Sequence, residues 1–282
     1  MDDFRSELGR LTKDLGTQIR LMRDFGLRDF ARADPLPDLQ VNRPVHQEIE
    51  VVGQAGFFSK PAGPSAGASA GASAGAASAG ARSTWQPNAS SPEEAQAELD
   101  ALRARLGECQ RCRLSEQRRS IVFGEGNPKA RVVLVGEGPG GEEDRTGRPF
   151  VGAAGQLLDR MLVAMGLGRD QIYICNVVKC RPPQNRTPEP EEMKICGRFL
   201  ADQLKIIHPR HIVCLGATAA QFLLKTNLSV SKLRGRIHDH PSGARVLPTY
   251  HPAYLLRNQA AKKPVWQDLQ LVMAEMAEGE QP

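Results

Sequence analysis

Four of the six cysteines in the 282-residue chain form two candidate metal-binding pairs. Cys109-x-x-Cys112 is closely spaced, and Cys180 and Cys196 form a second, wider pair. The other two cysteines lie in apolar runs typical of a protein core. Four thiolates can hold zinc or an iron–sulfur cluster, and their spacing does not choose between them. A Cys-x-x-Cys pair favours such a metal site over a disulfide framework.

A glycine-rich segment, Gly136-Glu137-Gly138-Pro139-Gly140-Gly141, follows an apolar run. It has the G-x-G-x-x-G spacing of dinucleotide-binding loops, but Pro139 and the residues that follow do not predict a helix opening at the glycines. The sequence therefore disfavours nucleotide binding. A glycine-rich turn at a strand end can instead let a ligand approach the backbone, with Glu137 beside it.

Two further segments carry polar side chains next to apolar runs. Residues 175–188 combine prolines and arginines, which predicts an extended, positively charged segment with Asn176 and Asn185 near a strand end. Such a segment suits a phosphate backbone, although a solvated loop would carry similar charge. Residues 249–257 place His251 directly before a helix that starts with proline.

The elements that must position these residues alternate along the chain. Strands are expected at 130–136, 171–178, 211–215 and 245–248, and helices at 153–165, 190–207 and 217–224. Alternation predicts an α/β fold with a parallel sheet covered on both faces. Ligands bind beyond the carboxyl ends of such strands. The loops after Val135, Val178 and Pro248 should therefore converge, which raises His251 above a merely structural histidine.

The first 90 residues differ in composition from the rest. Residues 4–32 have the spacing of an amphipathic helix, and residues 61–84 are built from near repeats of Ala, Gly and Ser without large apolar side chains. Ser91-Pro92-Glu93-Glu94 then predicts a capped helix start. We therefore expect a partly disordered extension at 1–60, a flexible linker at 61–90 and a folded domain at 91–282.

Charge and hydropathy limit the partners. The formal net charge is +5, and the whole excess lies in residues 91–282, because residues 1–90 hold ten basic and ten acidic side chains. A polyanionic partner is plausible there. Apolar runs are too short to cross a bilayer, and the N-terminus has no signal-peptide pattern, so a cytoplasmic, non-membrane protein is expected.

Four ordered motifs closely resemble the family 4 uracil-DNA glycosylases. They are Gly-Glu-Gly-Pro-Gly at 136–140, Thr-Gly-Arg-Pro-Phe-Val-Gly at 146–152, Asn-Val-Val-Lys-Cys-Arg-Pro-Pro at 176–183 and Tyr-His-Pro-Ala-Tyr-Leu-Leu-Arg at 250–257. The resemblance covers about residues 95–275. It implies a three-layer α/β/α domain around a four-stranded parallel sheet. It also implies hydrolysis of the N-glycosidic bond of uracil in DNA by a monomer, leaving an abasic site.

The same resemblance assigns roles to individual residues. It implies a [4Fe–4S] cluster on Cys109, Cys112, Cys180 and Cys196, with a structural rather than redox task. Base-binding roles are implied for Phe150, which stacks on the base, for Asn176, which hydrogen-bonds uracil N3–H and O4, and for Glu143, which blocks the thymine methyl. His251 resembles the family's donor to uracil O2. The chemistry also needs a group at the sugar, for which Glu137 is the leading candidate to orient water or stabilise the cation, with Asn185 as a second water-positioning group. Many uracil glycosylases of other families have an aspartate where this chain has Gly138, so we expect the backbone of Gly138 to contribute instead. Leu233-Arg234-Gly235-Arg236 resembles a DNA-facing loop, with a solvated turn as the alternative.

Three other functions remain open at this stage. A non-catalytic iron–sulfur DNA-binding module would be favoured by absence of Glu137 or His251, and both are present. A uracil-DNA cross-linking relative would carry a basic, histidine-containing insertion after the first motif, and residues 144–148 run directly into Phe150 without one. A zinc-dependent hydrolase would lack the visible absorption of a cluster near about 400 nm.

Overall fold

The computed structural model describes residue 85 and residues 88–278. The predicted extension at 1–60 and the Ala/Gly/Ser-rich segment at 61–84 lie outside the described residues. Among the described helices, none has the length and apolarity needed to cross a membrane.

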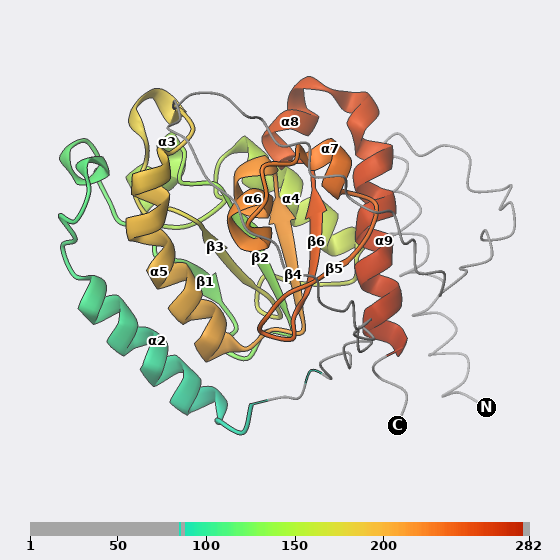
Figure 1. Cartoon of the computed structure of the whole chain (residues 1–282), viewed down its shortest axis with the longest axis horizontal. Coiled ribbons are helices and arrows are strands. Elements are labelled where there is room, and N and C mark those ends of the chain that lie inside the picture. Colours follow the sequence, from blue (N-terminus) through green and yellow to red (C-terminus); the bar gives the residue numbers. More distant parts are fainter. Residues whose placement is uncertain (1–84, 86–87, 279–282) are drawn as a thin grey trace, which may run out of the picture. The chain divides into compact units, whose positions relative to one another are not determined.

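A six-stranded sheet of order β1-β3-β2-β4-β6-β5 forms the centre of the domain (Figure 1). Its strands are β1 Glu125–Gly126, β2 Val132–Gly136, β3 Tyr173–Asn176, β4 His211–Leu215, β5 His238–Asp239 and β6 Arg245–Thr249. The four central strands are parallel and correspond to the four predicted strands. The two-residue strands β1 and β5 pair antiparallel at the edges, so the sheet has six strands rather than the expected four.

Helices cover both faces of the sheet, which confirms the three-layer arrangement (Figure 1). They are α2 Pro92–Leu106, α3 Gly141–Thr146, α4 Ala153–Ala164, α5 Pro190–Ile207, α6 Ala217–Leu224, α7 Val230–Leu233, α8 Pro252–Arg257 and α9 Lys262–Glu278, with short 3₁₀ turns at Arg113–Glu116, Pro183–Asn185 and Gln259–Ala261. Residues of α2, α5, α6 and α7 share one buried cluster, and those of α4, α8 and α9 share the other.

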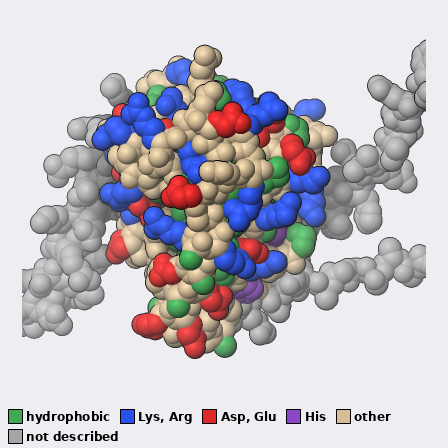
Figure 2. Space-filling view, turned by 90° about the vertical axis from the view of Figure 1, so that its left-hand side faces the viewer, with side chains coloured by type: hydrophobic (Ala, Val, Ile, Leu, Met, Phe, Trp, Pro, Cys, Tyr) green, Lys and Arg blue, Asp and Glu red, His purple; other side chains and the backbone are tan. Residues whose placement is uncertain are grey.

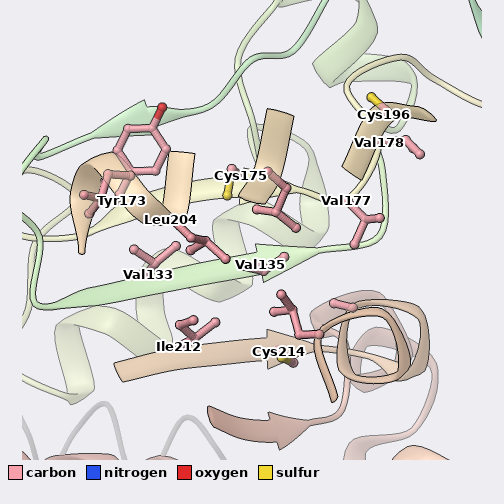
Figure 3. Packing of buried hydrophobic residues seen from close by; sticks show 14 of the residues in the cluster. Val133, Val135, Tyr173, Cys175, Val177, Val178, Cys196, Leu204, Ile212 and Cys214 are labelled. Atoms are coloured by element: carbon pink, nitrogen blue, oxygen red, sulfur yellow. The ribbon is translucent and has the colours of Figure 1, made fainter. Parts of the chain in front are cut away.

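Successive side chains of β2 point to opposite faces of the sheet and belong to different buried clusters. Val133 and Val135 of β2 belong to the cluster under α5, whereas Val132 and Leu134 belong to the cluster under α4. All five residues of β2 are buried, as expected for a strand inside a parallel sheet. Figure 3 shows Val133 and Val135 packed with Cys175 of β3 and with neighbouring side chains of β4. The buried core thus fixes the strand ends from which the polar loops extend.

The N-terminal boundary of the domain lies before α2. The predicted cap of α2 is confirmed, because Ser91 and Glu94 form a reciprocal capping box. Inside the range assigned to the linker, however, Trp85 stacks on His208 and donates from Nε1 to the His208 carbonyl at 3.2 Å. Asn88 donates to the Ile206 carbonyl at 3.1 Å. Residues 85 and 88–90 therefore pack on the domain.

The glycine-rich loop contains a short helix that the sequence did not predict. Helix α3 starts at Gly141, so the expectation that no helix opens at the glycines was wrong. The Glu143 carboxylate accepts from the Gly140 N–H at 3.1 Å, which caps the first turn from within. The helix start is thus occupied by the chain's own carboxylate, and it offers no free anion site to a nucleotide.

Candidate active site

A cavity of about 530 Å³ opens at the carboxyl edge of the sheet. Its walls come from the loops after β2, β3 and β6, as predicted, and also from the loop after β4. The cavity brings together every predicted substrate-binding and water-positioning residue: Glu137, Gly138, Glu143, Phe150, Asn176, Asn185 and His251. Segments more than a hundred residues apart therefore meet at one site, which is the arrangement expected for a parallel sheet.

Asn176 is the last residue of β3 and is 1% exposed. Its side-chain oxygen, Oδ1, has no hydrogen-bond partner among the described residues. Buried Lys179 donates from Nζ to the Asn176 carbonyl at 2.9 Å, which holds the backbone beside this side chain. Gly136 leaves the necessary room, because a Cβ there would press against Asn176 Oδ1 and lie 2.7 Å from the Phe150 ring. A buried acceptor without a hydrogen bond lowers the stability of the fold. A ligand that donates a hydrogen bond to Asn176 Oδ1 would remove this cost.

Phe150 forms a wall of the cavity with an unusual backbone. Its φ is 53°, a left-handed conformation that is strained for a bulky residue. Arg169 stabilises this turn by donating to the carbonyls of Pro149, at 3.1 Å, and Phe150. The ring stacks on His251 with centroids 5.5 Å apart and planes inclined by 30°. The left-handed backbone of Phe150 therefore places its aromatic ring in the site.

His251 precedes α8 and acts as its N-cap. Its Nδ1 accepts from the Ala253 N–H at 3.1 Å, so the proton of a neutral ring lies on Nε2. Burial lowers the pKa of His251 to about 4; the negative charge of Glu143 opposes this effect and the positive charge of Arg257 adds to it. The imidazole is therefore neutral at physiological pH, with one N–H donor free for the cavity.

Glu143 lines the cavity, and both of its carboxylate oxygens accept hydrogen bonds from backbone N–H groups. Oε2 accepts from Gly140, and Oε1 accepts from the N–H groups of Val151 and Gly152 at 2.9 Å each. These bonds join the start of α3 to the start of α4. Glu143 thus fixes the shape of the cavity wall next to Phe150.

Glu137 and Gly138 face the cavity from the β2–α3 loop. Thr218 on α6 donates from its hydroxyl to Glu137 Oε2. At Gly138 a Cβ would lie 2.7 Å from a Val178 methyl group, so only glycine lets this backbone pass so close. The loop therefore presents two groups to the cavity: the Glu137 carboxylate, which Thr218 holds, and the backbone at Gly138.

The polar loop after β3 is held by its own arginines. Arg181 donates from Nε to Asn185 Oδ1 at 2.8 Å, which leaves the Asn185 amide N–H₂ as the group free to act as a donor. Arg186 forms a bidentate pair with buried Glu192, at 2.8 and 2.7 Å. Both arginines thus fix the conformation of the loop and also give it positive charge.

The segment 233–236 is anchored more firmly than a solvated turn. Arg234 pairs with buried Asp268 through two bonds of 3.0 and 2.9 Å, and its guanidinium lies over the Tyr250 ring. Gly235 at the apex has a φ of 79°. Arg234 is consequently a structural residue, and Arg236 is the arginine of this segment left exposed.

The four predicted metal-ligating cysteines share one region beside α5. Cys109 and Cys112 pack against the buried cluster that contains Cys180 and Cys196. None of the cysteines forms a disulfide. Within the described residues, no group of three or more His, Cys, Asp or Glu side chains is gathered closely enough to hold a single metal ion.

The surroundings of these sulfur atoms suit a sulfur-ligated group. The Lys179 N–H donates to Cys196 Sγ at 3.2 Å, and Arg118 donates to Cys180 Sγ at 3.6 Å. Burial raises the pKa of Cys180 to about 12, while Arg118 opposes the shift. A bare Cys180 thiol would stay protonated at neutral pH, so a bound metal would have to displace its proton. The donors around the sulfur atoms would then stabilise the thiolates.

Two residues that hold the site were missed from the sequence. Thr218 contacts Glu137, and Arg169 holds Phe150. The signal for Thr218 was its position in the first turn of α6, directly after the carboxyl end of β4, a fourth strand end that was left out of the predicted site. For Arg169 the sequence held no comparable signal, because it holds Phe150 through backbone carbonyls about twenty residues away.

The fold and this site define a class of base-excising enzymes. The family model described as Uracil DNA glycosylase superfamily matches residues 123–270. The type-4 uracil-DNA glycosylase of Thermotoga maritima is 52% identical over 163 residues, which cover 57% of this chain and 85% of the relative. That of Archaeoglobus fulgidus is 45% identical over 167 residues, covering 56% of this chain and 83% of the relative. A type-5 uracil-DNA glycosylase of Thermus thermophilus is 36% identical over 149 residues, covering 46% and 68%. Within the superfamily, this chain belongs to the type-4 uracil-DNA glycosylases.

Proposed function

We propose that this protein excises uracil from DNA by hydrolysing the bond between uracil N1 and deoxyribose C1′. The observation that carries the proposal is the buried, unpaired Oδ1 of Asn176 inside the cavity. Uracil N3–H is a donor of the polarity that this oxygen requires, and the amide N–H₂ can donate to uracil O4. Cytosine presents the opposite pattern and would leave the amide unpaired, which can give discrimination of about 10⁴.

Binding in such a cavity requires the nucleotide to leave the DNA stack. A flipped base pays for the lost stacking by packing on an aromatic face and by pairing its edge. Phe150 supplies that face, and the wall held by Glu143 lies beside it. We assign to this wall the exclusion of the C5 methyl group, which is the only difference between thymine and uracil on that edge.

The neutral His251 suits the bond-breaking step. As the C1′–N1 bond breaks, its electron pair passes to uracil, and negative charge grows on O2. The His251 Nε2–H donates to that oxygen, and a donor already held in place by the Ala253 N–H needs no reorganisation. Removing one such donor typically costs about 3–4 kcal/mol of transition-state stabilisation.

The sugar side of the reaction is assigned to Glu137. Its carboxylate stabilises the cationic deoxyribose and accepts a proton from the water that attacks C1′. The Asn185 amide positions that water from the opposite loop, and the Gly138 backbone passes close to the sugar. The products are free uracil and an abasic site.

The four cysteines are proposed to hold a [4Fe–4S] cluster. The N–H donors to Cys180 and Cys196 fit sulfur ligands of such a cluster. The cluster would supply a structural cross-link and no electrons to the hydrolysis. Cys180 directly precedes Arg181 and Cys196 lies on α5, so the cysteines would tie the Asn185 loop to the domain.

The surface of the domain carries basic side chains that suit DNA. Figure 2 shows many Lys and Arg side chains on the face that carries α2 and α5, with acidic side chains among them. Exposed Arg145 and Arg148 pair with Glu142 and Glu125, and such exposed pairs are worth little. These arginines can therefore exchange a carboxylate for a phosphate at small cost.

The test is incubation of cluster-loaded protein with an oligonucleotide that contains one uracil, followed by alkali. Cleavage at the uracil position is expected, while matched strands with cytosine or thymine stay intact. An intact uracil strand would refute the proposal. A band near about 400 nm in the same preparation separates the cluster from zinc.

A further inference from the structure

Thr218, in the first turn of α6 directly after β4, hydrogen-bonds a proposed reacting group in the described site. It is 7% exposed, lines the cavity, and donates its hydroxyl hydrogen to Glu137 Oε2. The bond links the β2–α3 loop to the start of α6 across 81 residues of sequence. The four motifs that predicted the site do not include this residue.

The position of Thr218 is fixed by its surroundings. The Gly216 N–H donates to the Thr249 carbonyl at 2.9 Å, which ties the start of α6 to the end of β6. Gly216 has a φ of 98°, and a Cβ there would lie 3.3 Å from His251 Cβ. The start of α6, which carries Thr218, therefore lies against the backbone next to His251. The positive φ of Gly216 disfavours any other residue at this turn.

We propose that Thr218 is a positioning residue for uracil excision. Its hydroxyl holds Oε2 of Glu137, so that Oε1 faces the water that attacks C1′. A glutamate side chain has three rotatable bonds, and without a partner it would leave the attacking geometry for much of the time. The inference rests on the proposed function, because it assigns Thr218 a task in that same site.

Two simpler roles make different predictions. A threonine that only contacts DNA would change the dissociation constant of the DNA complex rather than the excision rate. A threonine that only packs the start of α6 would be replaced without loss by valine, which has the same shape and lacks the hydroxyl.

The experiment measures single-turnover excision with saturating enzyme for the wild type and for Thr218→Val and Thr218→Ser. We expect Thr218→Val to lower the rate about tenfold to hundredfold with the dissociation constant unchanged within about twofold. Thr218→Ser keeps the hydroxyl and should stay within about threefold of the wild type. Thr226→Val, in the turn after α6, is the matched control and should leave both quantities unchanged. An unchanged rate in Thr218→Val, or an equal loss in Thr218→Ser, would overturn the proposal.

A mutant cycle and a crystal structure separate this inference from the proposed function. In a Glu137→Ala background, Thr218→Val should change the rate by less than about twofold, because no carboxylate remains to be held. Full additivity of the two substitutions would contradict the proposal. Crystal structures of the wild type and Thr218→Val report the Glu137 carboxylate without any activity: it should be ordered on Thr218 in the first and displaced in the second. If wild-type protein left uracil intact, the proposed function would fail, and the two crystal structures would still decide whether Thr218 holds Glu137.

Discussion

The parallel strands begin at one side of the sheet, the amino edge, and end at the other, the carboxyl edge. The polar side chains at these two edges differ in how they are hydrogen-bonded. At the amino edge, His211 and Arg245 both bind Glu275, at 3.1 and 2.7 Å, and Arg245 also pairs with Asp239. At the carboxyl edge, the buried Asn176 oxygen has no partner in the described structure, and Phe150 keeps a strained backbone. The carboxylates of the amino edge are thus paired within the protein, although His211 Nδ1 there is buried without a hydrogen-bond partner among the described residues, while the unpaired Asn176 oxygen of the carboxyl edge lies at the cavity.

This difference indicates what each edge contributes. Paired charges stabilise the fold and have nothing left to offer a ligand. An unpaired buried amide costs stability, and it persists where the surrounding packing forces it. At the carboxyl edge Gly136, Lys179 and Arg169 supply that constraint, so substitutions there should change binding and chemistry more than folding.

The largest effect is expected for Asn176→Asp. The change keeps the size of the side chain but replaces the amide donor with an acceptor, so an ionised carboxylate would repel uracil O4. Uracil excision should fall by several kcal/mol, about a thousandfold or more. A protonated aspartate can pair with cytosine, so weak cytosine excision is the second expected result. Single-turnover rates on both substrates measure this, and undiminished uracil excision would remove Asn176 from base recognition.

The cysteine region should respond next, through the loop that it supports. Cys180→Ala should abolish the visible band near about 400 nm, lower the bound iron from about four per chain, and weaken DNA binding, because the Arg181 and Asn185 loop loses its tether. Cys214→Ala is the matched control: Cys214 is also buried, but it lies in β4 and is not one of the four proposed ligands. A full visible spectrum in Cys180→Ala, or its loss in Cys214→Ala, would contradict the ligand assignment.

Glu275→Gln tests the amino edge. Burial alone raises the pKa of Glu275, but hydrogen bonds from His211 and Arg245 outweigh it and lower the pKa to about 2. Because this folded pKa lies below the usual carboxyl value, the stabilisation is complete above about pH 4.5 and is lost as pH falls toward 2. Urea unfolding should show the variant about 2 kcal/mol less stable at pH 7, with a gap that narrows below about pH 4. Excision by the folded variant should equal the wild type, and a pH-independent gap would refute the charge argument.

Sequence periodicity was sufficient for the elements that build the core. Helices α5 and α6 have the predicted bounds, and the four parallel strands lie where β-branched runs predicted them. The edge strands β1 and β5 were missed because two residues carry no periodicity. Helix α3 was missed because it starts among glycines and a proline, and it is held by the Glu143 cap and by Gly147 with a φ of 72°.

The site was only partly accessible from the sequence. The motifs led to the residues that line the cavity, and convergence of strand ends placed them together. The positive φ of Phe150 depends on Arg169 and on Gly155, where a Cβ would clash with the Phe150 carbonyl, so it follows from tertiary contacts alone. The partner of Glu137 likewise comes from a distant helix.

The smallest effect on stability is expected from removing the N-terminal residues. All seven cavity residues predicted from the sequence lie beyond residue 136, and Trp85 and Asn88 contact residues 206 and 208, near the end of α5 and close to the amino edge. A chain starting at Ser83 keeps the stacked Trp85 ring, whereas a chain starting at Ser91 loses it. The shorter chain should be about 1–2 kcal/mol less stable in urea, since a stacked aromatic pair and its hydrogen bonds are removed. Both chains should excise uracil at the full-length rate within about tenfold, or 1.4 kcal/mol. A larger loss in the Ser83 chain would mean that the first 82 residues help to form the site. A larger loss confined to the Ser91 chain would mean that the contacts of Trp85 and Asn88 at the amino edge are transmitted through the sheet to the cavity, and the separation between the two edges would no longer hold.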